Sequence, residues 1–127
     1  MIYLNNNTNC LIDLLTTIDT LQKEAVNPIQ ENEGCLRPLG TLVTQYNTRP
    51  VSFFLCDNSE LVLNYYEDGT VLTSNVFRIE DIDGSCVVVR LLATEADGTF
   101  TATSETALVN VSCICAIRCL GDIFLEL

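Results

Sequence analysis

The sequence predicts a mainly β protein: an antiparallel β-sandwich or barrel-like domain preceded by one N-terminal α-helix. Apolar residues recur at helical spacing near residues 10–23, which is typical of one amphipathic helix. Beyond residue 35, short segments rich in β-branched and aromatic residues alternate with turn signals, including three Asp-Gly dipeptides. We therefore expect an arm, helix and linker over residues 1–34 and a β-sandwich domain over residues 35–127, forming a single globular unit.

The helix is expected to begin at Asn9 or Cys10 and to end before Pro28, which cannot continue it. Asp13 in the first turn and Lys23 in the last turn complement the helix dipole. One face carries the apolar residues Leu11, Leu14, Leu15, Ile18 and Leu21. Threonines within the segment lower its helix propensity, so packing must stabilise this helix.

The strands are predicted from runs of β-branched and aromatic residues between turns. Their expected ranges are 41–46, 51–56, 61–66, 71–74, 76–82, 86–92, 100–103, 107–117 and 123–127. Residues 86–92 are nearly all apolar, which is typical of a strand buried on both faces. Short strands with regular turn signals between them indicate an antiparallel sandwich or barrel.

The charge and the residue types exclude several functions. The chain has 6 Lys and Arg against 17 Asp and Glu, a formal net charge of −11, which argues against nucleic acid and anionic membranes as partners. It has no His, so it has neither a Ser-His-Asp nor a Cys-His catalytic unit, nor a His-ligated metal. It also has no glycine-rich phosphate loop. We therefore expect no enzyme activity, no catalytic residue, no cofactor and no metal site.

Hydrophobic residues make up 48% of the chain and charged residues only 18%. Because a free small domain usually has about 25% charged residues, partners are expected to cover part of the apolar surface. Residues 1–9 lack the basic and apolar segments of a signal peptide, and no run reaches the ~18 apolar residues of a membrane span. The protein is therefore expected to be made and kept inside a cell.

The chain has 7 cysteines, so at least one thiol must be free, bound to a metal or paired with another chain. Cys113, Cys115 and Cys119 lie together in an apolar segment near the end of the sequence. Three interpretations are open: small buried hydrophobes, metal ligands that need a fourth thiolate from elsewhere, or cross-links between chains. We favour cross-links, because a neighbouring subunit can reach thiols that are gathered near a chain end.

Two other cysteines, Cys10 and Cys35, flank the helix and the linker. They can pair with each other or with other chains, so both are candidates for cross-linking. Cys86 opens the apolar run of residues 87–89, which predicts a buried, inert thiol. Cys56 lies at the end of an expected strand, and its state is left open.

Four arginines stand out against the acidic background: Arg49, Arg78, Arg90 and Arg118. Each is expected to have a carboxylate partner, since an unpaired charge inside an apolar run such as that around Arg90 is costly. An ion pair between subunits and an ion pair within the chain are equally compatible with the sequence. All four are therefore candidates for inter-subunit ion pairs.

Several segments of the sequence together match a known pattern. They are Thr48-Arg49-Pro50, Phe77-Arg78-Ile79-Glu80, and the segments 85–92 and 112–120. With the N-terminal helix and residues 34–40, they resemble the spore coat protein Z family over nearly the whole chain, and the block with three cysteines is the most specific part. The chain departs from the family pattern in residues 23–33, where typical members carry several cysteines and this sequence has none. This departure implies fewer cross-links.

The resemblance implies a structural component of the outer spore coat or exosporium, made in the mother cell cytoplasm without a signal peptide. It also implies self-assembly into ordered two-dimensional lattices of rings, with a hexamer as the suggested ring, cross-linked through intermolecular disulfides. The expected partners are further copies of the chain and other spore coat proteins. Two alternatives stay open: a zinc-thiolate binding module, and a coat adaptor that binds another coat protein without assembling alone.

Overall fold

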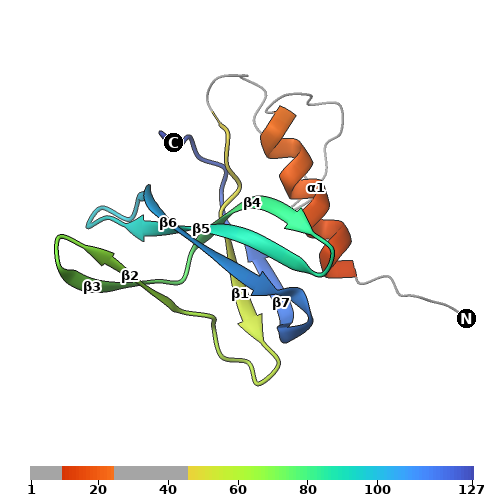
Figure 1. Ribbon diagram of the computed structural model, residues 1–127. Helices are drawn as coiled ribbons and strands as arrows, with labels where there is room; N and C mark the ends of the chain where they lie inside the picture. The colour runs from red at the N-terminus through yellow and green to blue at the C-terminus, as the bar shows by residue number, and fades with distance from the viewer. Residues whose placement is uncertain (1–9, 25–45) are drawn as a thin grey trace, which may run out of the picture.

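The computed structural model describes residues 10–24 and 46–127 (Figure 1). Within these ranges the protein is mainly β, with two antiparallel sheets preceded by one α-helix, which confirms the predicted fold class. The helix, α1, spans Cys10–Glu24. The strands are β1 Val51–Leu55, β2 Leu63–Glu67, β3 Thr70–Ser74, β4 Phe77–Asp83, β5 Cys86–Thr94, β6 Phe100–Asn110 and β7 Ile114–Cys119, with the short 3-10 helix η3, Val111–Cys113, between β6 and β7.

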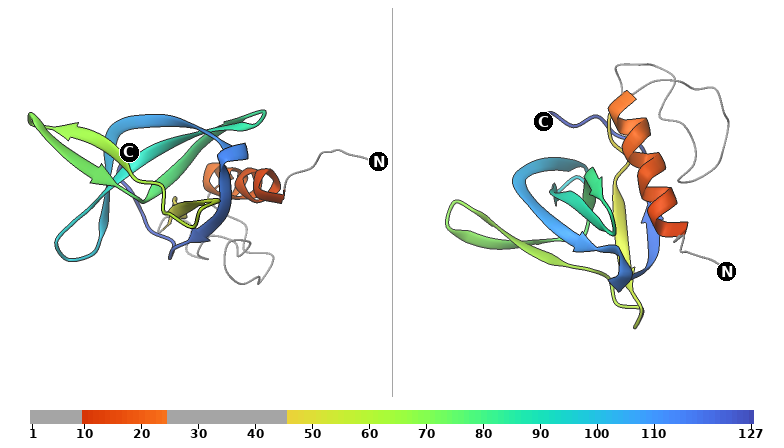
Figure 2. Two further views of the ribbon diagram at one scale, coloured as in Figure 1. Left: turned by 90° about the horizontal axis from the view of Figure 1, so that it is seen from below. Right: turned by 45° about the vertical axis from the view of Figure 1, so that its right-hand side comes forward.

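The larger sheet has five strands in the order β6-β5-β4-β1-β7, so its two edge strands are consecutive in the chain. In a flat sheet these two edges would lie about 19 Å apart. The chain from Asn110 to Ile114 spans at most about 14 Å. The sheet therefore curls until its edges approach each other at η3, which makes it barrel-like and partly closed (Figure 2).

Strands β2 and β3 form a separate two-stranded sheet that projects from the body of the molecule (Figure 1). Its turn is the predicted Asp68-Gly69 dipeptide, and Glu67 pairs with Thr70 across it. Asp68 and Gly69 have φ angles of 51° and 79°, which are the left-handed values of a two-residue turn that matches the strand twist. Asp and Gly adopt such angles more readily than most residues, so the local sequence specifies this hairpin.

Helix α1 packs against β4 of the larger sheet and buries Leu15 and Ile18 completely. The side chain of Gln22 fixes the position of the helix. Its Nε2 donates to the carbonyl oxygen of Ile79 at 2.7 Å, and its Oε1 accepts from the backbone N–H of Arg49 at 2.9 Å. The helix is therefore joined to two segments of the β region by a single buried amide.

The centre of the main core is a stacked aromatic pair, Phe53 of β1 and Phe77 of β4. Their ring centroids lie 5.5 Å apart, and both side chains are fully buried. Buried residues of β4, β5, β6 and α1 surround them. A second, smaller cluster consists of Val76, Leu92 and Leu125. The residues near the C-terminus thus pack against the sheet and help to close it.

The helix η3 interrupts the strand predicted at residues 107–117. Oδ1 of Asn110 accepts hydrogen bonds from the backbone N–H of Ser112 at 3.0 Å and from its hydroxyl at 2.8 Å, so Asn110 caps the short helix. The first part of that predicted strand joins the strand predicted at residues 100–103 to form β6, which has a register shift in its pairing with β5. The edge strand therefore ends at Asn110, and the chain turns into β7.

Two further strand predictions differ from the structure. Residues 86–92 were predicted to be buried on both faces, but β5 buries alternate residues and its second face is only half-buried. Within residues 123–127, only Ile123 takes part in an isolated β-bridge. The strand predicted at residues 41–46 and the linker before it lie almost wholly outside the described residues.

Candidate assembly and cross-linking sites

The β2–β3 hairpin exposes apolar side chains on both of its faces. Every residue of β3 except Ser74 is exposed. The cross-strand pair Tyr66 and Val71 is 66% and 53% exposed, and Leu72, which points to the opposite face, is 38% exposed. A two-stranded hairpin is marginally stable by itself in water. This surface is therefore the strongest candidate for contact with another protein molecule.

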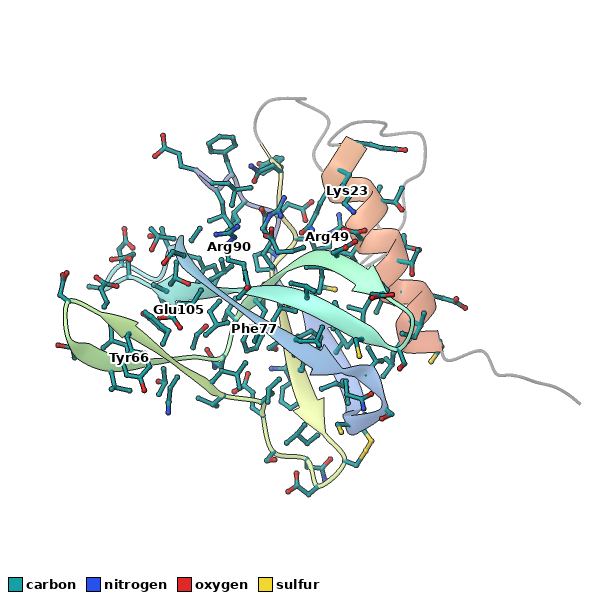
Figure 3. All side chains as sticks on the ribbon, viewed as in Figure 1. Lys23, Arg49, Tyr66, Phe77, Arg90 and Glu105 are labelled. Carbon is teal, nitrogen blue, oxygen red and sulfur yellow. A yellow bond between two sulfur atoms is a disulfide. The ribbon has the colours of Figure 1, made fainter. Side chains whose placement is uncertain are left out.

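Three interactions fix the hairpin to the rest of the molecule. Tyr65, next to the exposed Tyr66, is buried in the main core, and this burial raises the pKa of its hydroxyl. The backbone N–H of Tyr66 donates to Oε2 of Glu105 on β6 at 2.9 Å (Figure 3). The hydroxyl of Ser74 donates to the carbonyl oxygen of Leu92 at 2.6 Å. The hairpin therefore projects from the sheet in a defined direction.

A disulfide joins the end of β1 to β7. Cys56, directly after β1, is bonded to Cys115, 59 residues later, and their Cα atoms lie 4.9 Å apart. Strands β1 and β7 are neighbours in the sheet, with Leu55 opposite Ile114, so the bond closes one end of this strand pair. Both bonded cysteines are exposed. Cys119, the last residue of β7, is also disulfide-bonded.

Free thiols are carried by Cys10, Cys86 and Cys113 among the described residues. Cys10 begins α1 and Cys113 ends η3, and both are exposed, whereas Cys86 at the start of β5 is half-buried. Cys35 lies outside the described residues. Of the cross-linking candidates, Cys10 and Cys113 thus present a thiol at the surface, while Cys115 is bonded to Cys56 of the same chain.

Arg78 and Arg90 lie directly opposite each other on β4 and β5. Both contact the carboxylate of Glu80, whose Oε2 lies 2.8 Å from Arg78 Nη1 and 3.3 Å from Arg90 Nε. Like charges directly opposite each other in a sheet are destabilising. The shared carboxylate therefore allows both cations to occupy this face. It also gives these two candidates for inter-subunit ion pairs a partner within the chain.

The other two arginines differ in burial. Arg49 and Asp122 form a buried pair with two contacts, Nε to Oδ1 at 2.8 Å and Nη2 to Oδ2 at 3.1 Å, and their side chains are 1% and 6% exposed. Arg118 on β7 is exposed, and its guanidinium lies over the ring of Phe54, 5.0 Å from the centroid. None of the ion pairs between described residues includes Arg118. Among the four candidate arginines, its charge is thus the most accessible to a carboxylate of another molecule.

Comparison with known proteins places this chain in a family. A family model described as Spore coat protein Z matches residues 4–107, which is most of the chain. The chain belongs to the spore coat protein Z family. Membership of this family supports a structural role in the spore coat and implies a location there. A search of curated proteins and a search of solved structures each found no match.

The match to the spore coat protein Z family covers α1, the strands β1 to β5 and most of β6. It includes Thr48-Arg49-Pro50 and the region of Arg78, Glu80 and Arg90. It ends before residues 113–119, the part of the sequence that carries the most specific resemblance. The family match therefore does not include β7 and its cysteines.

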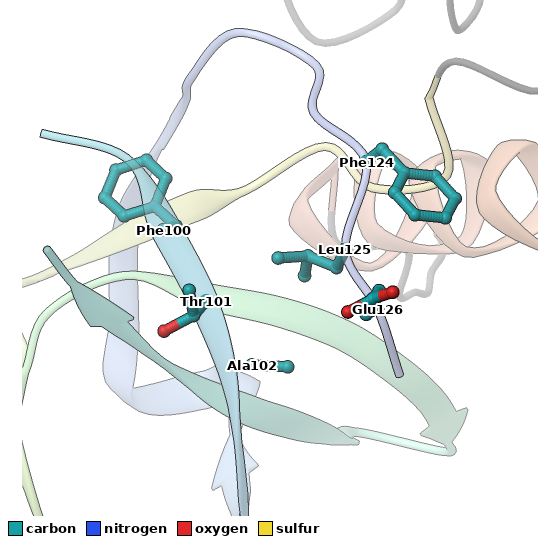
Figure 4. A pocket seen from close by; sticks show the side chains of 6 residues that line it. All are labelled: Phe100, Thr101, Ala102, Phe124, Leu125 and Glu126. Atoms are coloured by element: carbon teal, nitrogen blue, oxygen red, sulfur yellow. The ribbon is translucent and has the colours of Figure 1, made fainter.

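A pocket of ≈ 380 Å³ lies between β6 and the C-terminal segment of this spore coat Z family member (Figure 4). Its lining residues are Phe100, Thr101, Ala102, Phe124, Leu125 and Glu126. Of these, Glu126 alone carries a charge. Elsewhere in residues 10–24 and 46–127, no three His, Cys, Asp or Glu side chains are grouped so that they could hold a metal ion. No helix in the same ranges is long and apolar enough to span a membrane.

Proposed function

We propose that the protein is a structural subunit that self-associates into an ordered two-dimensional lattice in the spore coat or exosporium, where disulfides between chains fix it. The observation that carries this proposal is the β2–β3 hairpin, an anchored projection with exposed apolar side chains on both faces. The partners are further copies of the chain, arranged as rings that tile into a sheet, and other coat proteins.

Docking of the hairpin against a neighbouring copy would remove Tyr66, Val71 and Leu72 from water. Full burial of such a side chain contributes about 1.5–3 kcal/mol. Because these residues are already partly covered in the single chain, each would contribute about 1 kcal/mol. Such contacts are weak one at a time. In a lattice each copy has several neighbours, so the contacts of one copy act together.

Other features of the surface also favour association. Among the described strands, β6 pairs only with β5 and β7 only with β1, so each leaves an edge that a strand of another copy can join. The exposed cation of Arg118 suits a neighbour with a net charge of −11. The exposed thiols of Cys10 and Cys113 supply groups for cross-linking. In a dense array each thiol meets a high local concentration of others.

Electron microscopy of the purified protein with and without reductant tests this function. We expect rings or sheets in both conditions, because non-covalent contacts set the geometry, and covalent ladders on gels only when reductant is absent. Single chains in both conditions would overturn self-assembly and favour the coat adaptor. Co-expression with other coat proteins would then show whether the chain binds one of them.

A matched pair of variants tests the hairpin itself. In the first, Tyr66→Thr and Val71→Thr replace the exposed cross-strand pair with residues that keep a high strand propensity. In the second, Phe124→Thr replaces another exposed apolar residue, which is 57% exposed and lies near the C-terminus. We expect the hairpin variant to remain monomeric and the Phe124 variant to assemble. The opposite result would place the contact at the C-terminal segment and contradict the role of the hairpin.

A further inference from the structure

The corner between η3 and β7 places a free thiol beside an exposed disulfide. Cys113 is exposed and its thiol is free, and two residues later Cys115 is bonded to Cys56. Cys115 and Cys56 are exposed as well. Ile114, between Cys113 and Cys115, is only 5% exposed and packs in the core. A thiolate exchanges with a disulfide that it can reach by attacking one of its sulfur atoms. The free thiol and the disulfide that such an exchange needs are therefore both exposed at this corner.

The geometry points to a thiol–disulfide exchange site at this corner: the Cys113 thiol of one copy opens the Cys56–Cys115 disulfide of a second copy and links the two chains. The substrate is thus a disulfide of the same protein. Such exchange deepens the proposed assembly, on which it rests, because association brings the second copy within reach. It names both the residues that form the cross-link and the reaction that forms it.

The backbone at the corner disfavours a bond between Cys113 and Cys115 of the same chain. Ile114 has φ −102° and ψ 132°, which is extended. Residues two apart in an extended strand have Cα atoms about 6.6 Å apart. That distance is at the upper end of the range that disulfides accept, about 4.4–6.8 Å. A bond between Cys113 and Cys115 of one chain is therefore less favourable than one at the usual separation of about 5.5–6 Å, since Ile114 between them is packed in the core.

Hydrogen bonds also hold the residues directly before Cys113. Asn110 accepts two hydrogen bonds from Ser112, one from the backbone and one from the hydroxyl, so the short helix that ends at Cys113 is capped at its start. After Cys113, the disulfide joins β7 to the end of β1. The thiol and the disulfide therefore lie two residues apart in the chain, and both are exposed.

The exchange is balanced without any oxidant. The Cys113 thiol loses its proton to water, and its sulfur attacks one sulfur of the disulfide, for example Sγ of Cys115 in the second copy. The new S–S bond forms while the bond to Cys56 breaks, and the electron pair leaves on Cys56 Sγ, which takes a proton from water. One disulfide is lost and one is formed, so the number of free thiols does not change. The released Cys56 thiol can attack a third copy, and the linkage spreads.

The test uses the full chain in which peptide mass mapping has confirmed the Cys56–Cys115 bond. The protein is kept under argon with a metal chelator at pH 8, where thiolates form. We expect covalent dimers and larger species on non-reducing gels, a mapped bond between Cys113 and a cysteine of the Cys56–Cys115 pair of another chain, and a constant number of free thiols per chain. Cys113→Ser should abolish these species. Cys10→Ser, the matched change at the other exposed thiol, should not.

Two results on non-reducing gels would overturn the exchange site. One is linkage that grows only in air with a loss of free thiols, and the other is linkage that persists in Cys113→Ser. Electron microscopy of the same samples separates exchange from assembly. Sheets without covalent links under argon would refute the exchange and leave the lattice intact. Linked chains without sheets would refute the lattice and leave the exchange.

Discussion

The helix-covered core and the projecting hairpin use similar residues in opposite ways. Phe53 and Phe77 stack in the core and are fully buried, whereas Tyr66 and Val71 of the hairpin are more than half exposed although the hairpin is firmly anchored. The core stabilises the single chain. The hairpin adds little to that stability and becomes useful only when another molecule covers it. Mutations should therefore separate folding from assembly.

The largest effect on folding is expected for Phe77→Ala. Truncation of a fully buried, stacked ring removes its contacts and leaves a cavity, so the free energy of unfolding should fall by about 3–5 kcal/mol. The variant with Tyr66→Thr and Val71→Thr should change it by no more than about 0.5 kcal/mol. Urea denaturation at a protein concentration too low for assembly measures the stability of both variants. A hairpin variant as unstable as Phe77→Ala would make the hairpin part of the folding core and end the distinction.

Breaking the buried ion pair should lower the free energy of unfolding more than removing the exposed arginine. Asp122→Ala breaks the buried contact with Arg49, so the free energy of unfolding should fall by about 3 kcal/mol. Arg118→Ala removes an exposed cation that lies over Phe54, and should lower the free energy of unfolding by less than about 1 kcal/mol. Denaturation measures stability, and light scattering measures whether Arg118→Ala weakens assembly. Equal losses of stability would contradict the assignment of Arg49 to the core and Arg118 to the surface.

Ionic strength should act on assembly and leave folding nearly unchanged. Copies with a net charge of −11 repel each other, and the range of this repulsion falls from about 10 Å in 0.1 M salt to about 3 Å in 1 M salt. Added salt or divalent cations should therefore favour the lattice, as followed by light scattering and electron microscopy. Assembly that weakens steadily with salt would indicate that ion pairs, and not the apolar hairpin, dominate the contacts.

The smallest effects are expected at two turns with an aspartate. Hydrogen bonds from Ser59 and Thr99 lower the pKa of Asp57 and Asp97 from the ordinary value of 3.8. Because the pKa is lower in the folded chain, these bonds stabilise it above pH 3.8, and their contribution is lost as the pH falls through the folded pKa. In an NMR titration, Ser59→Ala should raise the pKa of Asp57 and leave that of Asp97 unchanged. If the pKa of Asp57 did not change, the hydrogen bond from the Ser59 hydroxyl would not be the cause of its lowered pKa.

Features set by neighbouring residues could be predicted from the sequence. The apolar spacing of α1 and the Asp68-Gly69 turn are local signals, and both are present in the structure. The break at η3 was missed because the β-branched run of residues 107–117 is typical of a strand. The available signal was Asn110, which can accept a hydrogen bond from the residue two positions later. A capping residue thus outweighed strand propensity.

Features set by strand order could not be predicted. The bond between Cys56 and Cys115 forms because β1 and β7 are neighbours, and 59 residues separate the two cysteines in sequence. The odd number of cysteines indicated that not all could pair within the chain, but gave no partners. The exposure of the hairpin has the same origin. The sequence shows which side chains of a strand point to the same face. The arrangement of the elements decides that nothing in the described chain covers Tyr66 and Val71.

The carboxylate of Glu80 has a consequence for the history of the protein. It contacts Arg78 and Arg90, which face each other across two strands. A change of Glu80 alone would leave two cations in direct opposition. A change of one arginine is milder, because Glu80 would still pair with the other. Related sequences that lose Glu80 should therefore also have replaced at least one of the two arginines.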